Sequence, residues 1–407
     1  MPLYLTNATY LDWKTLEITT ATIRVHEGPA GSIDLLDKLP PGETAIDCSN
    51  RIVTKSFAVG HHHIYSALAR GMPPPAISPT SFVEILERIW WRLDKALDSD
   101  MIRASALAAA IDAAHAGTTF IIDHHASPNA TTDSLHIIAE ALESVGLSHI
   151  LCYELSDRDG PECLEKAFIE TDRYLATHQG LVGLHASFTV SDDLLDCAMN
   201  LARAHNTGIH VHVAEAESDQ QHCFEKYGKR CVQRFADVGA LDFPQTILAH
   251  CIHLDANERH LVHDGKAWVA QQSESNQNNG VGTLDAREFS SRVFLGTDGM
   301  HGDPLAAARA TYLASQTVEG LSSLDAHARF RRVHSYISQN NFFGDSDNNL
   351  VILDYHPPTP ITPANWPAHV VYGLDRSHIE TVISSGRVIV RNRRCTLIDE
   401  ETVLADA

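Results

Sequence analysis

The sequence predicts an α/β protein: a (β/α)8 TIM-type barrel with a small β-domain built from both chain ends. The first observation is a set of eight short apolar runs between residues 57 and 300, each bounded by Gly, Asp or His. Most of these runs are continuously apolar, as expected of parallel strands buried on both faces. The second is that helical patterns separate the runs, over a length close to the about 250 residues of a typical barrel. The third is that no glycine-rich phosphate fingerprint follows the first run, which disfavours a doubly wound open sheet.

The predicted strands follow one another along the chain. They are Phe57–His63, Thr118–Ala126, His149–Leu155, Leu181–Val190, Ile209–Glu215, Thr246–Leu254, Ala267–Ser275 and Arg292–Met300. Two of the helices between them have recognisable ends. One follows Thr132-Asp133 and stops at Gly146. Another starts at Ser191, has acidic residues in its first turn, and ends before Gly208.

Two segments lie outside the predicted barrel, and both read as β structure. They contain the strand patterns Ile18–Val25, Leu350–Tyr355 and Thr381–Val390, the last with a turn at Ser385-Gly386. Neither segment is long enough to bury a core alone. We therefore expect a composite β-domain from residues 1–55 and 345–407, and a barrel from residues 56–344.

Composition and charge narrow the class of protein. Of the 407 residues 44% are hydrophobic and 20% are charged, so the chain can bury a large core. A net charge of −21 makes nucleic acid and anionic membranes poor partners. The eight cysteines form no C-x-x-C pair, and the N-terminus has neither a basic segment nor a long apolar one. These features predict a cytoplasmic protein with reduced thiols, and they do not exclude an anionic small molecule as a ligand.

Histidine is unusually abundant, at 25 residues, and it gathers near the ends of the predicted strands. A barrel directs side chains from the C-terminal ends of its strands toward one point. His61 and His63 share a face of the first strand, as do His210 and His212 on the fifth. Two H-x-H pairs are close to what chance supplies at this composition, so their position carries the prediction. With Asp298 on the eighth strand, these imidazoles suit Zn²⁺ or Fe²⁺ and an activated water.

This arrangement resembles the amidohydrolase superfamily, with H-x-H on the first strand, H-x-x-E on the fifth, His on the sixth and Asp on the eighth. Within it, the chain is similar to the cytosine-deaminase and chlorohydrolase-like branch, and more closely to the SsnA-type aminohydrolases. The stretches that carry the likeness are HHHIYSALARGM at 61–72, GTT at 117–119, DHHASP at 123–128, LCYE at 151–154, GTDGMH at 296–301 and DYHPPTP at 354–360.

The resemblance implies a role for each residue that matches the pattern. The metal ligands it implies are His61, His63, His212 and Asp298. Glu215 matches a carboxylate that shuttles protons, and Asp298 also accepts the proton of the attacking water. His250 matches a histidine that ligates the metal in some members and only polarises in others. The catalytic residues implied are therefore Glu215, His250 and Asp298.

Substrate contacts are implied less directly. His185 matches a fourth-strand position that often faces substrate, and His125, His301 and Arg70 are further candidates near the strand ends. Trp90-Trp91, in the helix that follows the first strand, is assigned to the core or an interface. The fourth predicted strand holds no lysine to bridge two metals, so one metal per chain is expected.

The chain departs from the family pattern in two places. Lys55-Ser56 stands where Pro-Gly usually precedes the first strand, and GDSDNN at 344–349 departs from a glycine- and acid-rich signature. We expect the first departure to alter a turn, and the second to affect only the small domain.

Together these observations predict a mononuclear, metal-dependent hydrolase with one Zn²⁺ or Fe²⁺ per chain that deaminates a nitrogen heterocycle. Opening of a cyclic amide, or displacement of chloride or sulfur from such a ring, is the alternative reaction. A barrel that binds metal or ligand without turnover is less favoured, because Glu215 and Asp298 are both present. Related barrels commonly dimerise, so a homodimer is the candidate assembly.

Overall fold

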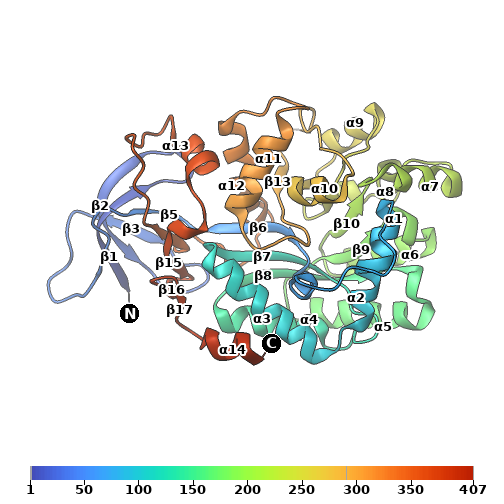
Figure 1. The fold of residues 1–407 in the computed structure, drawn as a ribbon, viewed down its shortest axis with the longest axis horizontal. Coiled ribbons are helices and arrows are strands. Elements are labelled where there is room, and N and C mark those ends of the chain that lie inside the picture. The colour runs from blue at the N-terminus through green and yellow to red at the C-terminus, as the bar shows by residue number, and fades with distance from the viewer. Residues whose placement is uncertain (1, 290, 407) are drawn as a thin grey trace.

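Eight parallel strands form the centre of the molecule in this computed structural model, which describes residues 2–289 and 291–406 (Figure 1). They neighbour one another in chain order: β6 (Phe57–His62), β7 (Thr118–His125), β8 (Ser148–Leu155), β9 (Val182–Ala186), β10 (Ile209–Val213), β11 (Ile247–His250), β12 (Trp268–Gln271) and β13 (Val293–Leu295). The segment after β13 returns to β6, where the Thr297 amide donates to the His61 carbonyl over 2.8 Å and the His63 amide to the Asp298 carbonyl over 3.3 Å. The sheet therefore closes on itself, which confirms the predicted barrel.

Every predicted barrel strand begins within one residue of the first residue of the matching observed strand. Several of the observed strands, however, end earlier than predicted. The run Leu181–Val190 leaves the sheet at Ala186 and continues as a short turn of 3-10 helix, Ser187–Thr189. The run Ala267–Ser275 leaves it at Gln271, and a helix begins at Ser273. These strand-end turns are buried as deeply as the strands, so apolar character alone does not mark where a strand stops.

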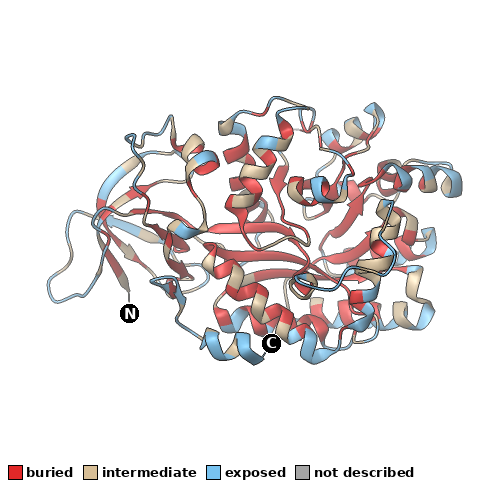
Figure 2. Cartoon of the chain, in the orientation of Figure 1, coloured by how far each residue is buried: buried red, intermediate tan, exposed pale blue. Residues whose placement is uncertain are grey.

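Helices cover the barrel, with their exposed faces outward (Figure 2). They are α3 (Ser99–His115), α4 (Ser134–Val145), α5 (Pro161–Leu175), α6 (Asp192–Ala204), α7 (Glu217–Tyr227), α8 (Cys231–Asp237), α9 (Ala256–Asp264), α10 (Ser273–Asn279), α11 (Pro304–Ser315) and α12 (Ser323–Gln339). The predicted cap of α6 is present, since Ser191 Oγ accepts from the Leu194 amide over 3.3 Å. Before α4, Asp133 is left-handed at φ +64° and its side chain makes no cap bond.

A second sheet draws on both ends of the chain. Its main path runs β17 (Arg394–Cys395), β16 (Arg387–Arg391), β15 (Ile379–Ser384), β14 (Leu350–Leu353), β5 (Ile52–Lys55), β1 (Leu3–Leu11), β2 (Ile18–Val25) and β3 (Ile33–Leu36), with β4 (Ile46–Asp47) beside β1. β5 is the join, pairing parallel to β1 and antiparallel to β14. α13 (Trp366–Ala368) lies between β14 and β15, and α14 (Glu400–Asp406) follows the last strand. The residue bounds proposed for the two domains stay a prediction.

The two departures from the family pattern meet at the junction between this sheet and the barrel. Lys55, only 2% exposed, places its Nζ 2.8 Å from Asp345 Oδ1. The other carboxylate oxygen of Asp345 lies 2.7 Å from His334 Nδ1 on α12. Arg331, also on α12, donates to the Lys55 carbonyl over 3.1 Å. The first departure therefore supplies one half of a buried ion pair and does more than reshape a turn.

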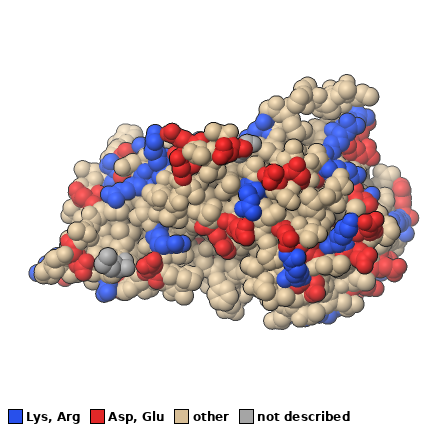
Figure 3. All heavy atoms as spheres, turned by 90° about the horizontal axis from the view of Figure 1, so that it is seen from below, with Lys and Arg blue, Asp and Glu red and all other residues tan. Residues whose placement is uncertain are grey.

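A short helical segment follows η1 (Ile64–Ala69) and lies at the barrel end away from the second sheet (Figure 1). It consists of α1 (Phe82–Ile85), η2 (Leu86–Trp90) and α2 (Trp91–Ala96). On the face drawn in Figure 3, acidic and basic side chains are interspersed. Within residues 2–289 and 291–406, no helix has the length and apolarity needed to cross a membrane.

Candidate metal centre and active site

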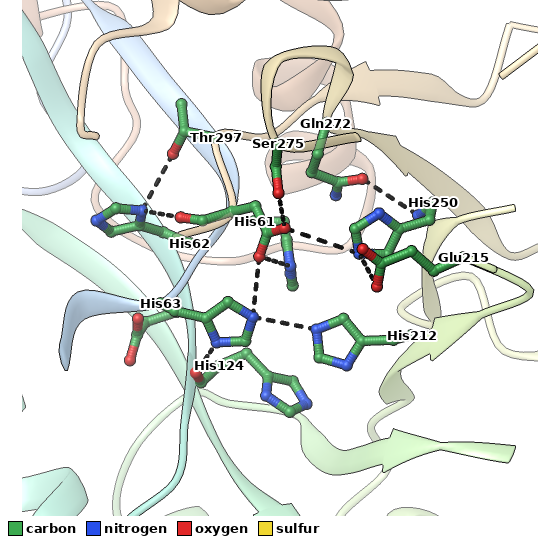
Figure 4. Close-up of polar contacts among 12 residues, drawn as sticks. His61, His62, His63, His124, His212, Glu215, His250, Gln272, Ser275 and Thr297 are labelled. Carbon is green, nitrogen blue, oxygen red and sulfur yellow. Dashed lines mark hydrogen bonds and ion pairs between the residues drawn. The ribbon is translucent and has the colours of Figure 1, made fainter. Parts of the chain in front are cut away.

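Four predicted ligands come together at the C-terminal ends of the strands (Figure 4). His61 and His63 end the β6 segment, His212 lies on β10 and Asp298 follows β13. His63 Nε2 lies 3.1 Å from His212 Nε2 and 3.1 Å from Asp298 Oδ1. His61 Nε2 lies 3.5 Å from the same carboxylate oxygen. One ligand atom from each residue falls within 4.8 Å of all the others.

The hydrogen bonds of these imidazoles fix which nitrogen faces the centre. His63 Nδ1 donates to the His124 carbonyl and His212 Nδ1 to the His185 carbonyl, each over 2.7 Å. In a neutral imidazole, a protonated Nδ1 leaves Nε2 as an acceptor. Two acceptor nitrogens and a carboxylate oxygen therefore face one another at about 3 Å, an arrangement that repels unless a cation lies among them.

Two further observations show that this group suits a cation. His61 Nε2 is buried and has no hydrogen-bond partner among the described residues. A proton can serve as that cation, since burial opposes protonation of His63, yet hydrogen bonding to the Asp298 carboxylate raises its pKa to about 9. The nitrogen and oxygen donors suit one Zn²⁺ or Fe²⁺ with an open position, as the sequence predicts.

A second group adjoins the first and shares Asp298 with it. His250 Nε2 lies 3.3 Å from Glu215 Oε2 and 4.0 Å from Asp298 Oδ2. His250 Nδ1 lies 2.8 Å from Asn276 Oδ1, which leaves Nε2 turned to the centre. Burial and the nearby Asp298 charge raise the pKa of Glu215 well above its usual range. Glu215 is thus suited to hold a proton at neutral pH and to pass it on.

Ser275 and Asn279, both on α10, hold the carboxylates of this second group. Ser275 Oγ donates to Asp298 Oδ2 over 2.5 Å, and Asn279 Nδ2 donates to Glu215 Oε1 over 3.4 Å. Both side chains come from α10, whose first residues the sequence prediction assigned to the strand Ala267–Ser275. They were therefore missed, although a polar helix directly after a barrel strand is a position from which side chains reach the site.

Both groups border one cavity, which His63, His212, Glu215 and Asp298 help to line. Its walls are mainly aromatic and acidic. They include His63, Tyr65, Phe82, Leu86, Trp90, Trp91, Asp94, Glu154, His185, Phe188, His212, Glu215, Asp219, Ser275, Asn279, Asp298 and Met300.

Of the four residues predicted to contact substrate, only His185 is among the described residues that line the cavity. His125 hydrogen-bonds Ser127 Oγ over 2.9 Å, and His301 pairs with Glu274 over 2.7 Å. Arg70 is half-exposed and pairs with Asp112. The structure thus brings His185 to the ligand group and places the other three outside the cavity wall.

The helical segment after β6 forms a wall that the sequence prediction missed. Trp90 and Trp91 were assigned to the core or an interface, but both line the cavity, and so does Asp94. The signal present in the sequence was a pair of large aromatic residues just beyond a metal-ligating strand. Periodicity alone does not tell whether such a helix packs outward or folds back over the barrel.

Comparison with known proteins gives a family and several similar chains. Residues 57–334 match the profile of the amidohydrolase family. The 5-methylthioadenosine/S-adenosylhomocysteine deaminase of Thermoanaerobacter pseudethanolicus is 23% identical over 89% of this chain and 87% of its own. The 5′-deoxyadenosine deaminase of Methanosarcina mazei is 24% identical over 96% of this chain and 93% of its own.

Solved structures share the fold at lower identity. An adenosine deaminase from Xanthomonas campestris with bound zinc has a TM-score of 0.84 at 16% identity, covering 99% of this chain and 96% of its own. Atrazine chlorohydrolase from Arthrobacter aurescens, complexed with zinc, has a TM-score of 0.83 at 16% identity, covering 99% and 98%. The family match confirms the resemblance that the strand-end motifs indicated.

Proposed function

The chain belongs to the amidohydrolase family, and from that premise we propose that it hydrolyses the exocyclic C–N bond of an adenine-type heterocycle and releases ammonia. The observation that carries the proposal is the convergence of three imidazoles and Asp298 beside a buried, protonatable Glu215. The relatives named as deaminases of adenine nucleosides support the substrate class.

We assign the metal to His61, His63, His212 and Asp298, with His250 beside it. A divalent cation, when bound, makes water nucleophilic at neutral pH and polarises the group under attack. Asp298 accepts the proton of the attacking water, and the 2.5 Å hydrogen bond from Ser275 holds its second oxygen in place. Hydrogen bonding of this kind orients a carboxylate for proton transfer.

Glu215 completes the reaction by moving protons at the substrate. It gives its proton to a ring nitrogen as water adds to the neighbouring carbon. It then takes the proton held by Asp298 and delivers it to the amino group, which leaves as ammonia, and it regains its own proton from the hydroxyl group, which becomes the carbonyl. His250, 3.3 Å from Glu215 with its Nε2 turned to the centre, polarises the group under attack. Net, one water is consumed and one ammonia is released.

The test is ammonia release by the purified protein from a panel of adenine nucleosides, cytosine, guanine, pterins, hydantoins and chlorotriazines. Deamination of an adenine nucleoside is the expected outcome. Hydantoin opening without ammonia, or chloride release from a triazine, would replace this proposal with the alternative reaction. Elemental analysis of protein purified without added metal should find about one Zn or Fe per chain. A ratio near two would reject the mononuclear site.

The cellular setting forms part of the same proposal. We propose a cytoplasmic location, which fits the free thiols of the eight cysteines. We also keep the homodimer as the candidate assembly, to be checked by light scattering of the purified protein.

A further inference from the structure

One end of the cavity has acidic side chains that the proposed chemistry does not use. Asp94 on α2 and Glu154 on β8 both line the cavity, and both are buried, at 1% and 7% exposure. Glu154 Oε2 lies 3.8 Å from His124 Nδ1, and the His124 ring centre lies 4.7 Å from that of His212. One imidazole therefore separates this acidic pair from the metal ligands.

The cations near this pair are outnumbered. Arg158 pairs with Asp94, lies 3.4 Å from Glu154 and lies 2.9 Å from Asp159. Lys95 pairs with Asp159 over 2.8 Å, but its side chain is half-exposed. Two cations thus share three carboxylates. In the described part of the chain no Lys or Arg lines the cavity, whereas Asp94 and Glu154 do, so this end of the cavity presents acidic groups and no basic side chain to a ligand.

Asp94 also has an unused acceptor. Its Oδ2 accepts from Arg158, whereas its Oδ1 is buried and has no hydrogen-bond partner among the described residues. A buried carboxylate oxygen without a donor costs free energy that a ligand's N–H would recover. Burial, with the charge of Asp94, raises the pKa of Glu154 to about 7, so a second acceptor is available once a cation approaches.

Aromatic rings border the same space. The Trp91 ring lies 5.9 Å from the His185 ring, and Trp90 lies 6.4 Å from Tyr65 in an edge-on arrangement. Arg158 lies over the Trp91 ring, with its guanidinium carbon 5.2 Å from the ring centre. Aromatic faces attract cations as well as flat heterocycles, so these rings suit a substrate whose substituent is positively charged.

We propose that this end of the cavity binds a cationic nitrogen substituent of the substrate against Asp94 and Glu154, and that it rejects substrates with a carboxylate there. The inference rests on the proposed function, because it takes the substituent to be part of a substrate whose heterocycle lies at the metal site. It makes Asp94 a specificity-determining residue, with a role separate from proton transfer.

The first test compares three nucleosides that differ only at the 5′ position: 5′-amino-5′-deoxyadenosine, 5′-deoxyadenosine and adenosine-5′-carboxylate. At neutral pH, kcat/KM should be at least about tenfold higher for the amine than for the neutral nucleoside, and lowest for the carboxylate. Asp94→Asn should bring the amine-to-neutral ratio below about threefold. The matched control is Glu87→Gln, which removes an exposed carboxylate of the same helical segment that is not in the cavity wall and should keep the ratio.

The second test does not depend on turnover. Benzylamine and benzyl alcohol have nearly the same shape and differ in charge, and their binding to the metal-loaded enzyme can be followed by tryptophan fluorescence. Benzylamine should bind at least about tenfold more tightly, and Asp94→Asn should remove that difference. Equal binding of the two in the wild-type protein would overturn the inference, and so would a preference for the carboxylate nucleoside. Failure of every nucleoside to react, with benzylamine still preferred, would reject only the proposed adenine substrate.

Discussion

Several residues at the strand ends adopt backbone angles that their side chains disfavour. Ala214, His250, Cys251 and Asp298 all have positive φ, between +49° and +72°. Such angles cost non-glycine residues about 1 kcal/mol or more each, and they concentrate at functional sites. Here the turn at Ala214 leads from the ligand on β10 to Glu215, and the turns at His250 and Asp298 set those side chains directly. Backbone strain is therefore part of how the two groups are brought together.

Replacing Glu215 separates proton transfer from metal binding. Glu215→Gln keeps the size of the side chain and removes no proposed ligand, so metal content and melting temperature should stay near wild-type. Turnover should fall by roughly 10² or more, the usual worth of a positioned acid or base. The comparison variant is His212→Ala, which should lose metal and activity together. Near-normal turnover of Glu215→Gln would show that the carboxylate only orients its neighbours.

For single residues, the sequence predicts the proposed metal ligands well and the residues of the cavity wall poorly. His61 and His63 stand two apart on one strand, so a local pattern is enough to find them. Trp91 and Asp94 reach the cavity only because the segment 82–96 folds across the barrel end. That path is set by tertiary packing, which no spacing within the segment records. His125 and Arg70 lie near strand ends in the sequence but are not in the cavity lining, since closeness in sequence to a strand end does not point a side chain inward.

The seam between β6 and β13 depends on a glycine. A Cβ added at Gly60 would lie 2.4 Å from the Phe294 ring and 2.7 Å from the Leu295 carbonyl oxygen. The carbonyl belongs to the backbone of the facing strand and cannot move aside without disturbing the closure. Glycine at this position therefore lets the last strand approach the first.

We expect Gly60→Ala to lower the free energy of unfolding by roughly 1–3 kcal/mol, as overpacking usually does. Gly71→Ala is the comparison, because Gly71 has φ +79° but open space around its Cβ position, so its cost should be nearer 1 kcal/mol. Urea unfolding of both variants measures the difference. Equal stability of Gly60→Ala and wild-type would mean that the seam relaxes freely.

Strand order and strand starts were predictable, since each apolar run begins abruptly after polar residues. Strand ends were not, and the reason is local. Ser187 and Ser273 stand just beyond their strands yet are buried, because the barrel mouth is enclosed by its own loops. A residue can therefore read as part of a strand when it already belongs to the turn that carries function.

For the whole molecule, the buried pair at the domain junction predicts how stability depends on pH. Burial favours the neutral acid, but His334 and Lys55 lower the pKa of Asp345 to about 2, below an unfolded value of about 3.9. A lowered pKa means that the stabilisation is complete above about pH 4 and is lost as the pH falls toward 2. Arg331 and Asp347 also lie near this group and shift the pKa of Lys55 in opposite directions.

Asp345→Asn should therefore lose roughly 2 kcal/mol of stability at neutral pH. The gap to wild-type should narrow as the pH drops from about 4 to 2, because the wild-type carboxylate becomes protonated. Chemical denaturation at a series of pH values checks this. A gap that stays constant down to pH 2 would show that Asp345 contributes no electrostatic stability.

The two-ended sheet predicts the outcome of removing the N-terminal segment. β5 pairs with β1 on one side and β14 on the other, so β1 to β3 and β14 to β17 share one hydrogen-bonded path. Limited proteolysis should not release residues 1–50 from a remainder that stays folded. A stable fragment beginning near residue 51 would contradict the composite domain.

The same sheet has a consequence during synthesis. β5 cannot form its hydrogen bonds to β14 until β14 has been synthesised. β14 emerges from the ribosome about 300 residues later, or about 15–60 s at ordinary elongation rates. Throughout that interval β5 carries an unpaired edge beside a barrel that is still being made, the condition in which strands join the wrong neighbours. Nascent chains halted before residue 350 should expose this edge to a protease and bind chaperones, and chains extended past residue 391 should lose both properties. The strands of the last sixty residues thus complete the sheet that the first fifty-five residues begin, and they can do so only near the end of synthesis.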